Sequence, residues 1–163
     1  MVTVRPPQAR SIEEILQAAR RRLDRLEPAE AHREFSRGQA LLVDIRPQAH
    51  RAAEGEVPGS LIIERNVLEW RFDPASPARL PQATGYDVRV IVLCAEGYTS
   101  SLAAASLHEL GLTRATDVIG GYRAWRAAGL PTTGAPHAAA PDPTYPTLPP
   151  EPVMNARPAR RSR

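Results

Sequence analysis

Residues 90–105 read VIVLCAEGYTSSLAAA, and the rest of the chain is organised around this stretch. Its first four residues are aliphatic, which is typical of a strand buried on both faces of a sheet. Cys94 follows where the strand ends, Gly97 permits a tight turn, and small residues then begin a helix that Thr99 or Ser100 can cap. The stretch therefore predicts a βα unit with a cysteine at its turn.

The same alternation continues on both sides of this unit. Short aliphatic runs predict strands over 40–44, 61–63, 88–93 and 116–119. Helical patterns lie between them, over 47–53, 67–70, 99–110 and 122–128. Strands separated by helices predict an α/β fold with three layers, α/β/α, around a parallel sheet. Ligands of such folds bind outside the carboxyl ends of the strands, which is where Cys94 lies.

Both ends of the chain differ from this middle part. Ser11 and Glu14 fit a capping box and open an amphipathic helix, and a second helix is expected over 28–37. Four arginines of the first segment are interpreted as a solvated face, with anion binding as the alternative: Arg20, Arg21, Arg22 and Arg25. Residues 134–163 are rich in Pro, Ala and Arg, which predicts a disordered tail. We therefore expect an N-terminal arm with an extra helix over 1–25, a domain over 26–133, and the tail.

Composition excludes several classes of protein. The chain has 163 residues, of which 42% are hydrophobic and 24% charged, as in one soluble domain with its own core. A single cysteine excludes a disulfide framework or a multi-cysteine metal site, and the four histidines show no ligand spacing, so we expect no metal. The net charge of +3 is spread over interspersed arginines and acids, which argues against nucleic acid. Without a long apolar run, we expect no membrane association and a cytoplasmic location.

Cys94 is the candidate nucleophile. A tight loop between a strand and a helix surrounds the sulfur with backbone N–H groups, and such surroundings favour the thiolate. The alternative is a buried structural cysteine, which is common in strands. Its position at the carboxyl end of the strand, directly before a glycine turn and a helix, favours the nucleophile.

Four motifs in this order resemble those of single-domain rhodaneses, over roughly residues 26–131. Leu42-Val-Asp44-Ile-Arg46 resembles the L-x-D-x-R strand, and residues 55–60, GEVPGS, resemble the G-H-I-P-G-A turn. Residues 94–100, CAEGYTS, resemble the active-site loop C-x-x-G-x-[RST]. Residues 118–125, VIGGYRAW, resemble the start of the last helix, L-x-G-G-x-x-A-W.

The resemblance implies a rhodanese-like, five-stranded parallel sheet in the order 3-2-4-5-1, with a very short first strand near Leu26. It also implies a sulfurtransferase of the thiosulfate or mercaptopyruvate type, which carries sulfane sulfur as a persulfide on Cys94 without a cofactor. The donor would be a small molecule, and the acceptor a thiol, cyanide or a protein. The residues of the loop that would surround the donor are Ala95, Glu96, Gly97, Tyr98, Thr99 and Ser100.

The loop departs from the family at two positions. Thr99 stands where many members carry Arg, and Glu96 stands where mercaptopyruvate-type loops carry Ser or Thr. Because Glu96 repels anions and the loop lacks a cation, we expect poor use of thiosulfate and better use of a persulfide or mercaptopyruvate. Arg65 or Arg71, after the second aliphatic run, is the candidate to supply the positive charge.

Several further residues are interpreted as structural. Asp44 and Arg46 are expected to bond to each other or to loop backbone, Trp70 and Trp125 to anchor packing, and His108 to lie on the surface. Two other classes of function stay open. One is a catalytically silent rhodanese-like module for protein interaction or regulation. The other is a thiol phosphatase or arsenate reductase, whose C-x5-R loop would need an arginine where Ser100 stands.

Overall fold

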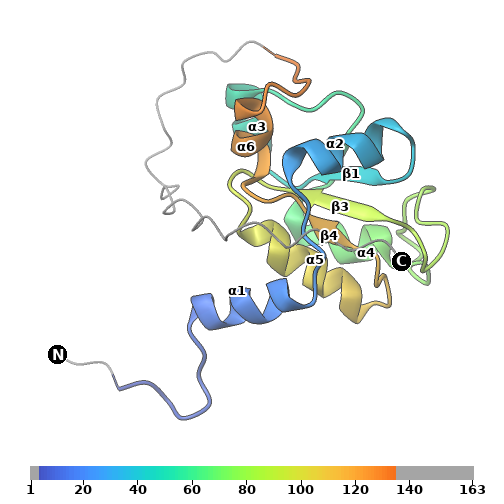
Figure 1. Cartoon of the computed structure of the whole chain (residues 1–163). Helices are drawn as coiled ribbons and strands as arrows, with labels where there is room; N and C mark the ends of the chain where they lie inside the picture. Colours follow the sequence, from blue (N-terminus) through green and yellow to red (C-terminus); the bar gives the residue numbers. More distant parts are fainter. Residues whose placement is uncertain (1–3, 135–163) are drawn as a thin grey trace, which may run out of the picture.

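A parallel sheet lies between two layers of helices in the computed structural model, which describes residues 4–134 (Figure 1). The strands are β1 (Leu41–Asp44), β2 (Leu61–Ile62), β3 (Val90–Leu93) and β4 (Thr116–Asp117), in the order β2-β1-β3-β4. Every pairing is parallel, so all four carboxyl ends meet at one edge of the sheet. The tail expected over 134–163 lies outside the described residues, apart from Gly134.

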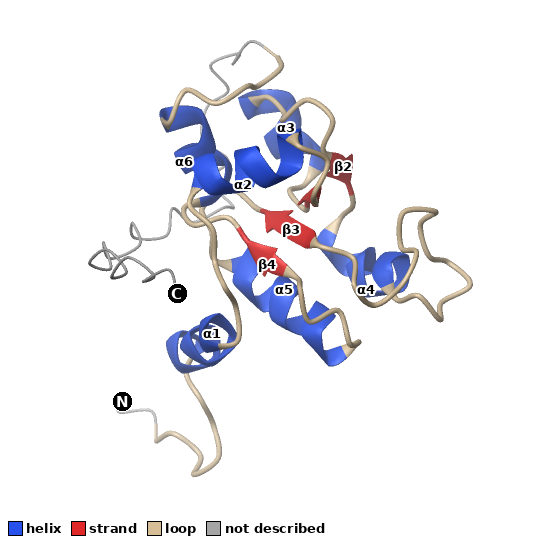
Figure 2. Ribbon diagram, turned by 45° about the vertical axis from the view of Figure 1, so that its right-hand side comes forward, coloured by secondary structure: helices blue, strands red, loops and turns tan. Residues whose placement is uncertain are grey.

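Helices cover both faces of this sheet, as the alternating pattern predicts. In Figure 2, α1 (Ile12–Arg21), α4 (Leu68–Phe72) and α5 (Thr99–Glu109) lie on one side. The other side carries α2 (Pro28–Ser36), α3 (Gln48–Glu54) and α6 (Gly121–Ala127), and a 3₁₀ turn, η1 (Arg65–Val67), precedes α4.

Two hydrophobic clusters fill the space on either side of β3. Val90 and Val92 belong to the cluster under α4 and α5, whereas Ile91 and Leu93 belong to the cluster under α2 and α6. All four side chains are fully buried. Because successive side chains of a strand point to opposite faces, a continuous aliphatic run is what a doubly covered strand requires.

Residues 4–134 form four strands, where five are expected. At the place of the expected first strand, Leu26 makes a single parallel bridge to Val118, beside β4. Leu26 N donates to Asp117 O (3.1 Å), and Ile119 N donates to Leu26 O (2.9 Å). Pro28 begins α2 directly afterwards and has no N–H group, so the pairing cannot continue.

The N-terminal helix packs onto the domain. Its capping box is confirmed, since Glu14 N donates to Ser11 Oγ and Ser11 N donates to the Glu14 carboxylate. The helix α1 packs against α5 and buries Leu16 and Ala19. It ends at Arg21, and a segment without regular secondary structure leads to the bridge at Leu26.

Candidate active site

Cys94 lies at the carboxyl end of β3 and is 4% exposed. Its Sγ accepts a hydrogen bond from Gly97 N at 3.1 Å. Gly97 has φ +84°, so the left-handed turn that its presence predicts is confirmed. This contact is one of the N–H contacts with the sulfur that the sequence predicts. A donor N–H group stabilises the charged sulfur more than the neutral thiol.

The start of α5 differs from the expectation. Its N-cap is Tyr98, which makes no side-chain cap, so the prediction of a Thr99 or Ser100 cap is wrong. Thr99 is the first helical residue and is exposed. Ser100 is fully buried and donates to Asp117 instead, because the side chain of Asp117 reaches the first turn of the helix from β4.

The last helix holds the carbonyl side of the loop. Tyr122 N donates to Cys94 O (2.8 Å), and Arg123 N donates to Ala95 O (3.1 Å). This approach requires glycine at position 121, where φ is +60° and an added Cβ would lie 2.4 Å from Cys94 O. The two glycines of the last motif therefore allow α6 to begin against the Cys94 loop (residues 94–100).

Two arginines reach the Cys94 loop from the N-terminal segment. Arg20 Nη2 and Arg25 Nη2 donate to Gly97 O at 2.9 and 3.0 Å. The solvated-face interpretation is therefore wrong for these two, while Arg21 and Arg22 are exposed. The two contacts join residues that are 77 and 72 positions apart, so no local spacing in the sequence could have indicated them.

A buried carboxylate joins the N-terminal segment to α5. Asp117 is fully buried and forms an ion pair with Arg25 (Nε to Oδ1, 2.8 Å). Its Oδ2 accepts from Ser100 Oγ and Ser101 Oγ, each at 2.8 Å. Arg20 Nε donates to Ser101 Oγ at 3.2 Å. The sequence analysis did not single out Asp117, because nothing local distinguishes it from other residues at strand ends.

Glu96 points to the start of α6. Its carboxylate forms an ion pair with Arg123, and its side chain is 18% exposed. The negative charge that the sequence analysis expects to repel donors therefore has a positive partner beside it. On the same loop, the ring of Tyr98 lies under the guanidinium of Arg20, with 5.4 Å between Arg20 Cζ and the ring centre.

Asp44 and Arg46 form a buried pair on the other side of β3. Arg46 Nη2 donates to Asp44 Oδ2 (2.7 Å) and to Gly55 O (2.8 Å), so the pair bonds both internally and to loop backbone. The guanidinium lies 3.8 Å from the centre of the Tyr122 ring. Burial raises the pKa of Tyr122 above its ordinary value, although the charge of Arg46 acts in the opposite direction.

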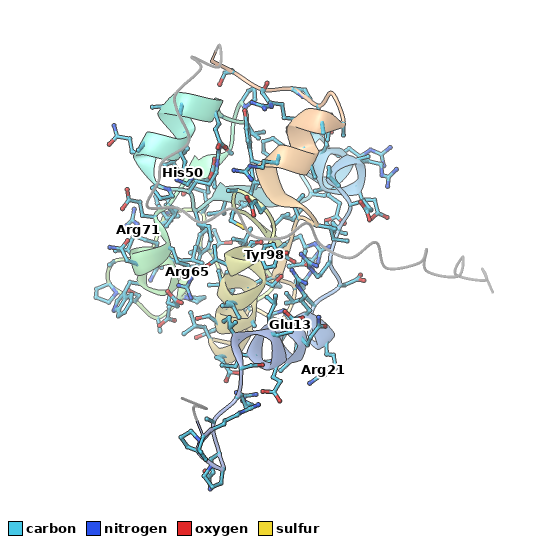
Figure 3. The ribbon with its side chains drawn as sticks, turned by 90° about the vertical axis from the view of Figure 1, so that its left-hand side faces the viewer. Glu13, Arg21, His50, Arg65, Arg71 and Tyr98 are labelled. Carbon is cyan, nitrogen blue, oxygen red and sulfur yellow. The ribbon has the colours of Figure 1, made fainter. Side chains whose placement is uncertain are left out.

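Arg65 and Arg71 lie on the η1–α4 segment (Figure 3). Among the described residues, Arg65 bonds to Glu69 (2.6 Å) and Arg71 to Ala78 O (2.5 Å), and neither has a hydrogen bond or ion pair with the Cys94 loop. Burial raises the pKa of Glu69, but hydrogen bonds from Ser106 and Arg65 outweigh it and leave that pKa below its ordinary value. The charge of Arg65 is therefore paired with Glu69, and a role of Arg65 toward the donor stays a prediction.

The predictions for Trp125, Trp70 and His108 have different outcomes. Trp125 is fully buried and donates from Nε1 to Pro131 O, so its role in packing is confirmed. Trp70 is 61% exposed, because Leu68 and Phe72 form the buried face of α4 and Trp70 lies on the opposite face, so the packing prediction is wrong there. His108 is half-buried and contacts Ala115 O at 2.7 Å, so it is not a free surface residue.

Residues 4–134 contain neither a cluster of metal-ligating side chains nor a membrane-spanning helix. No three or more His, Cys, Asp or Glu side chains gather there as a metal site would need. In the same residues, no helix has the length and apolar character needed to cross a membrane.

Comparison with known proteins agrees with this geometry. The adenylyltransferase and sulfurtransferase MOCS3-1 of Zea mays is 40% identical over 85 residues, which are 52% of this chain and 18% of that protein. The matched part of the chain thus spans about a fifth of the length of these curated relatives.

Solved structures share the fold. A protein of unknown function from Rhodopseudomonas palustris, titled a possible tyrosine phosphatase, is 32% identical, with a TM-score of 0.71 over 80% of this chain and 100% of that one. The thiosulfate sulfurtransferase of Pseudomonas aeruginosa is 22% identical, with a TM-score of 0.57 over 73% of this chain and 21% of that one. The family model of the rhodanese-like domain matches residues 27–128. The chain therefore belongs to the rhodanese-like domain family.

Proposed function

We propose that this protein is a sulfurtransferase that carries sulfane sulfur as a persulfide on Cys94. The observation that carries the proposal is the hydrogen bond from Gly97 N to Cys94 Sγ, at 3.1 Å, in a loop at the carboxyl edge of the sheet. A thiolate with a fixed N–H donor is the nucleophile that such chemistry needs. The sulfurtransferase relatives support the same chemistry.

The transfer takes place in two displacements. The Cys94 thiolate attacks the outer sulfur of the donor, a new S–S bond forms, and the donor's own bond to that sulfur breaks. Its electron pair leaves on the donor remnant, which is sulfite from thiosulfate, a thiolate from a persulfide, or the enolate of pyruvate from mercaptopyruvate, and the enolate takes up a proton. A thiolate or cyanide acceptor then attacks the outer sulfur of the persulfide, and Cys94 is released as thiolate. No net oxidation occurs, so the cycle needs no redox cofactor.

A phosphatase is less compatible with this loop. The sixth residue after Cys94 is Ser100, whose hydroxyl is buried against Asp117 at 2.8 Å. Arg20 and Arg25 bond to the carbonyl oxygen of Gly97, so they do not occupy the position of a loop arginine that would grip a phosphate. Hydrolysis of an aryl phosphate by the wild type, lost in Cys94→Ser, would favour the phosphatase.

The first prediction concerns Cys94 itself. After incubation with thiosulfate, mercaptopyruvate or glutathione persulfide, the wild type gains one sulfur, about 32 Da, by intact mass spectrometry, and an acceptor thiol removes it. Cys94→Ser gains nothing and loses sulfur transfer, because its hydroxyl does not form a persulfide. Turnover near the wild-type rate in Cys94→Ser would refute the mechanism. A folded wild type that takes up no sulfur from any of the three donors would support the silent interaction module.

A further inference from the structure

Both backbone polar groups of Gly97, its N–H and its carbonyl, are hydrogen-bonded to side chains. Its N–H group donates to Cys94 Sγ at 3.1 Å, while its carbonyl oxygen accepts from Arg20 and Arg25 at 2.9 and 3.0 Å. Gly97 has φ +84°, in the left-handed region. Because glycine populates positive and negative φ about equally, its surroundings decide which conformation it keeps. Two charged donors on one carbonyl form strong hydrogen bonds, so they fix the turn that aims the N–H group at the sulfur.

Both guanidinium groups are themselves fixed by a buried network. Arg25 bonds to both carboxylate oxygens of Asp117, at 2.8 and 3.2 Å, and the side chain of Arg25 is only 13% exposed. Arg20 bonds to Ser101 Oγ, which in turn donates to Asp117. The network connects α1, β4 and α5 at the base of the Cys94 loop.

Other charged groups surround the loop from the remaining elements. Glu96 is paired with Arg123 of α6, and Asp44 of β1 is paired with Arg46. Glu54 Oε2 of α3 lies 3.5 Å from Arg46 Nη1. The two arginines of the N-terminal segment differ from these groups because they bond directly to the residue whose N–H contacts the sulfur.

We infer that Arg20 and Arg25 are positioning residues for Cys94, acting through the carbonyl oxygen of Gly97. Both precede residues 27–128, which the family model matches, so this chain braces its active-site loop with a segment outside the family's domain. The inference rests on the proposed role of Cys94 as the nucleophile. It makes α1 part of the reactive site.

The experiment measures the reactivity of Cys94 in the full chain. Because Cys94 is the single thiol, intact mass gives its rate of alkylation by iodoacetamide at pH 7 and at pH 10. Arg20→Met keeps the length of the side chain without donors. We expect its rate at pH 7 to fall about three- to tenfold, while the rate at pH 10, which is above the ordinary pKa of a free thiol, stays within about twofold.

Two matched variants separate positioning from charge. Arg20→Lys keeps a donor and should recover most of the rate at pH 7. Arg21→Met removes the same charge from the same helix at an exposed position, which Figure 3 shows directed away from Tyr98, and should match the wild type. An unchanged ratio of the two rates in Arg20→Met, or an equal loss in Arg21→Met, would overturn the inference.

Arg25→Met tests the second donor and should show the same pattern, provided that its thermal unfolding stays cooperative. If it fails to fold, Arg20→Met alone decides the outcome. Alkylation needs no sulfur donor, so this result is independent of whether the protein transfers sulfur. Persulfide loading of the wild type decides that separately.

Discussion

Two buried arginine–aspartate pairs flank β3 at the carboxyl edge of the sheet. Asp44 on β1 and Asp117 on β4 are both fully buried, and each binds a guanidinium. Arg46 follows Asp44 by two residues, whereas Arg25 precedes Asp117 by 92. The same ion pair is thus formed once between near neighbours at the end of β1 and once between residues far apart in the sequence. The difference shows that a buried ion pair beside the site can form between neighbours in the sequence or only through tertiary packing.

The two pairs also differ in what else supports the carboxylate. Arg46 donates to the Asp44 carboxylate from both its backbone N and its guanidinium. Asp117 has the hydroxyls of Ser100 and Ser101 in addition to Arg25. The two aspartates should therefore respond differently when the arginine is removed.

Removal of the Arg46 guanidinium should have the largest effect on stability. In Arg46→Met, a fully buried carboxylate keeps a backbone N–H and loses its countercharge, which costs about 3–5 kcal/mol of unfolding free energy. Urea unfolding measures this loss. Asp44→Asn in the same background should restore part of it, because it removes the unpaired charge. A loss below about 1 kcal/mol would show that water or another group reaches Asp44.

Removal of the Arg25 guanidinium should cost less. Asp117 keeps two hydroxyl donors in Arg25→Met, and Arg25 is itself partly solvated, so we expect a loss of about 2–3 kcal/mol. The measurement is urea unfolding beside Arg46→Met. Ser100→Ala in the Arg25→Met background should widen the loss by about 1 kcal/mol. If Arg25→Met alone loses as much as Arg46→Met, the hydroxyls do not support Asp117 as proposed.

The same contrast between local and distant contacts decides how much the sequence could predict. The aliphatic run of β3, the capping box at Ser11 and the turn at Gly97 depend on neighbouring residues, and their patterns predict them well. The single bridge at Leu26 has no periodicity to detect. The contacts of Arg20 and Arg25 with the loop arise only when α1 docks on α5. Solvent exposure of Trp70 likewise depends on what α4 packs against.

The smallest effect is expected at a third pair, on the loop itself. Glu96 and Arg123 are 18% and 50% exposed, so neutralising either changes stability by less than about 1 kcal/mol. Their effect on an anionic donor should be visible nonetheless, provided that the protein transfers sulfur from thiosulfate. Glu96→Gln leaves Arg123 unbalanced and should lower the KM for thiosulfate about two- to threefold, and Arg123→Gln should raise it by a similar factor. These shifts are smaller than an isolated Glu96 would produce, because the partner already cancels most of its field. The double variant should return to the wild-type KM. Shifts of the same sign in both single variants would mean that Glu96 and Arg123 act through the shape of the loop and not through their charges.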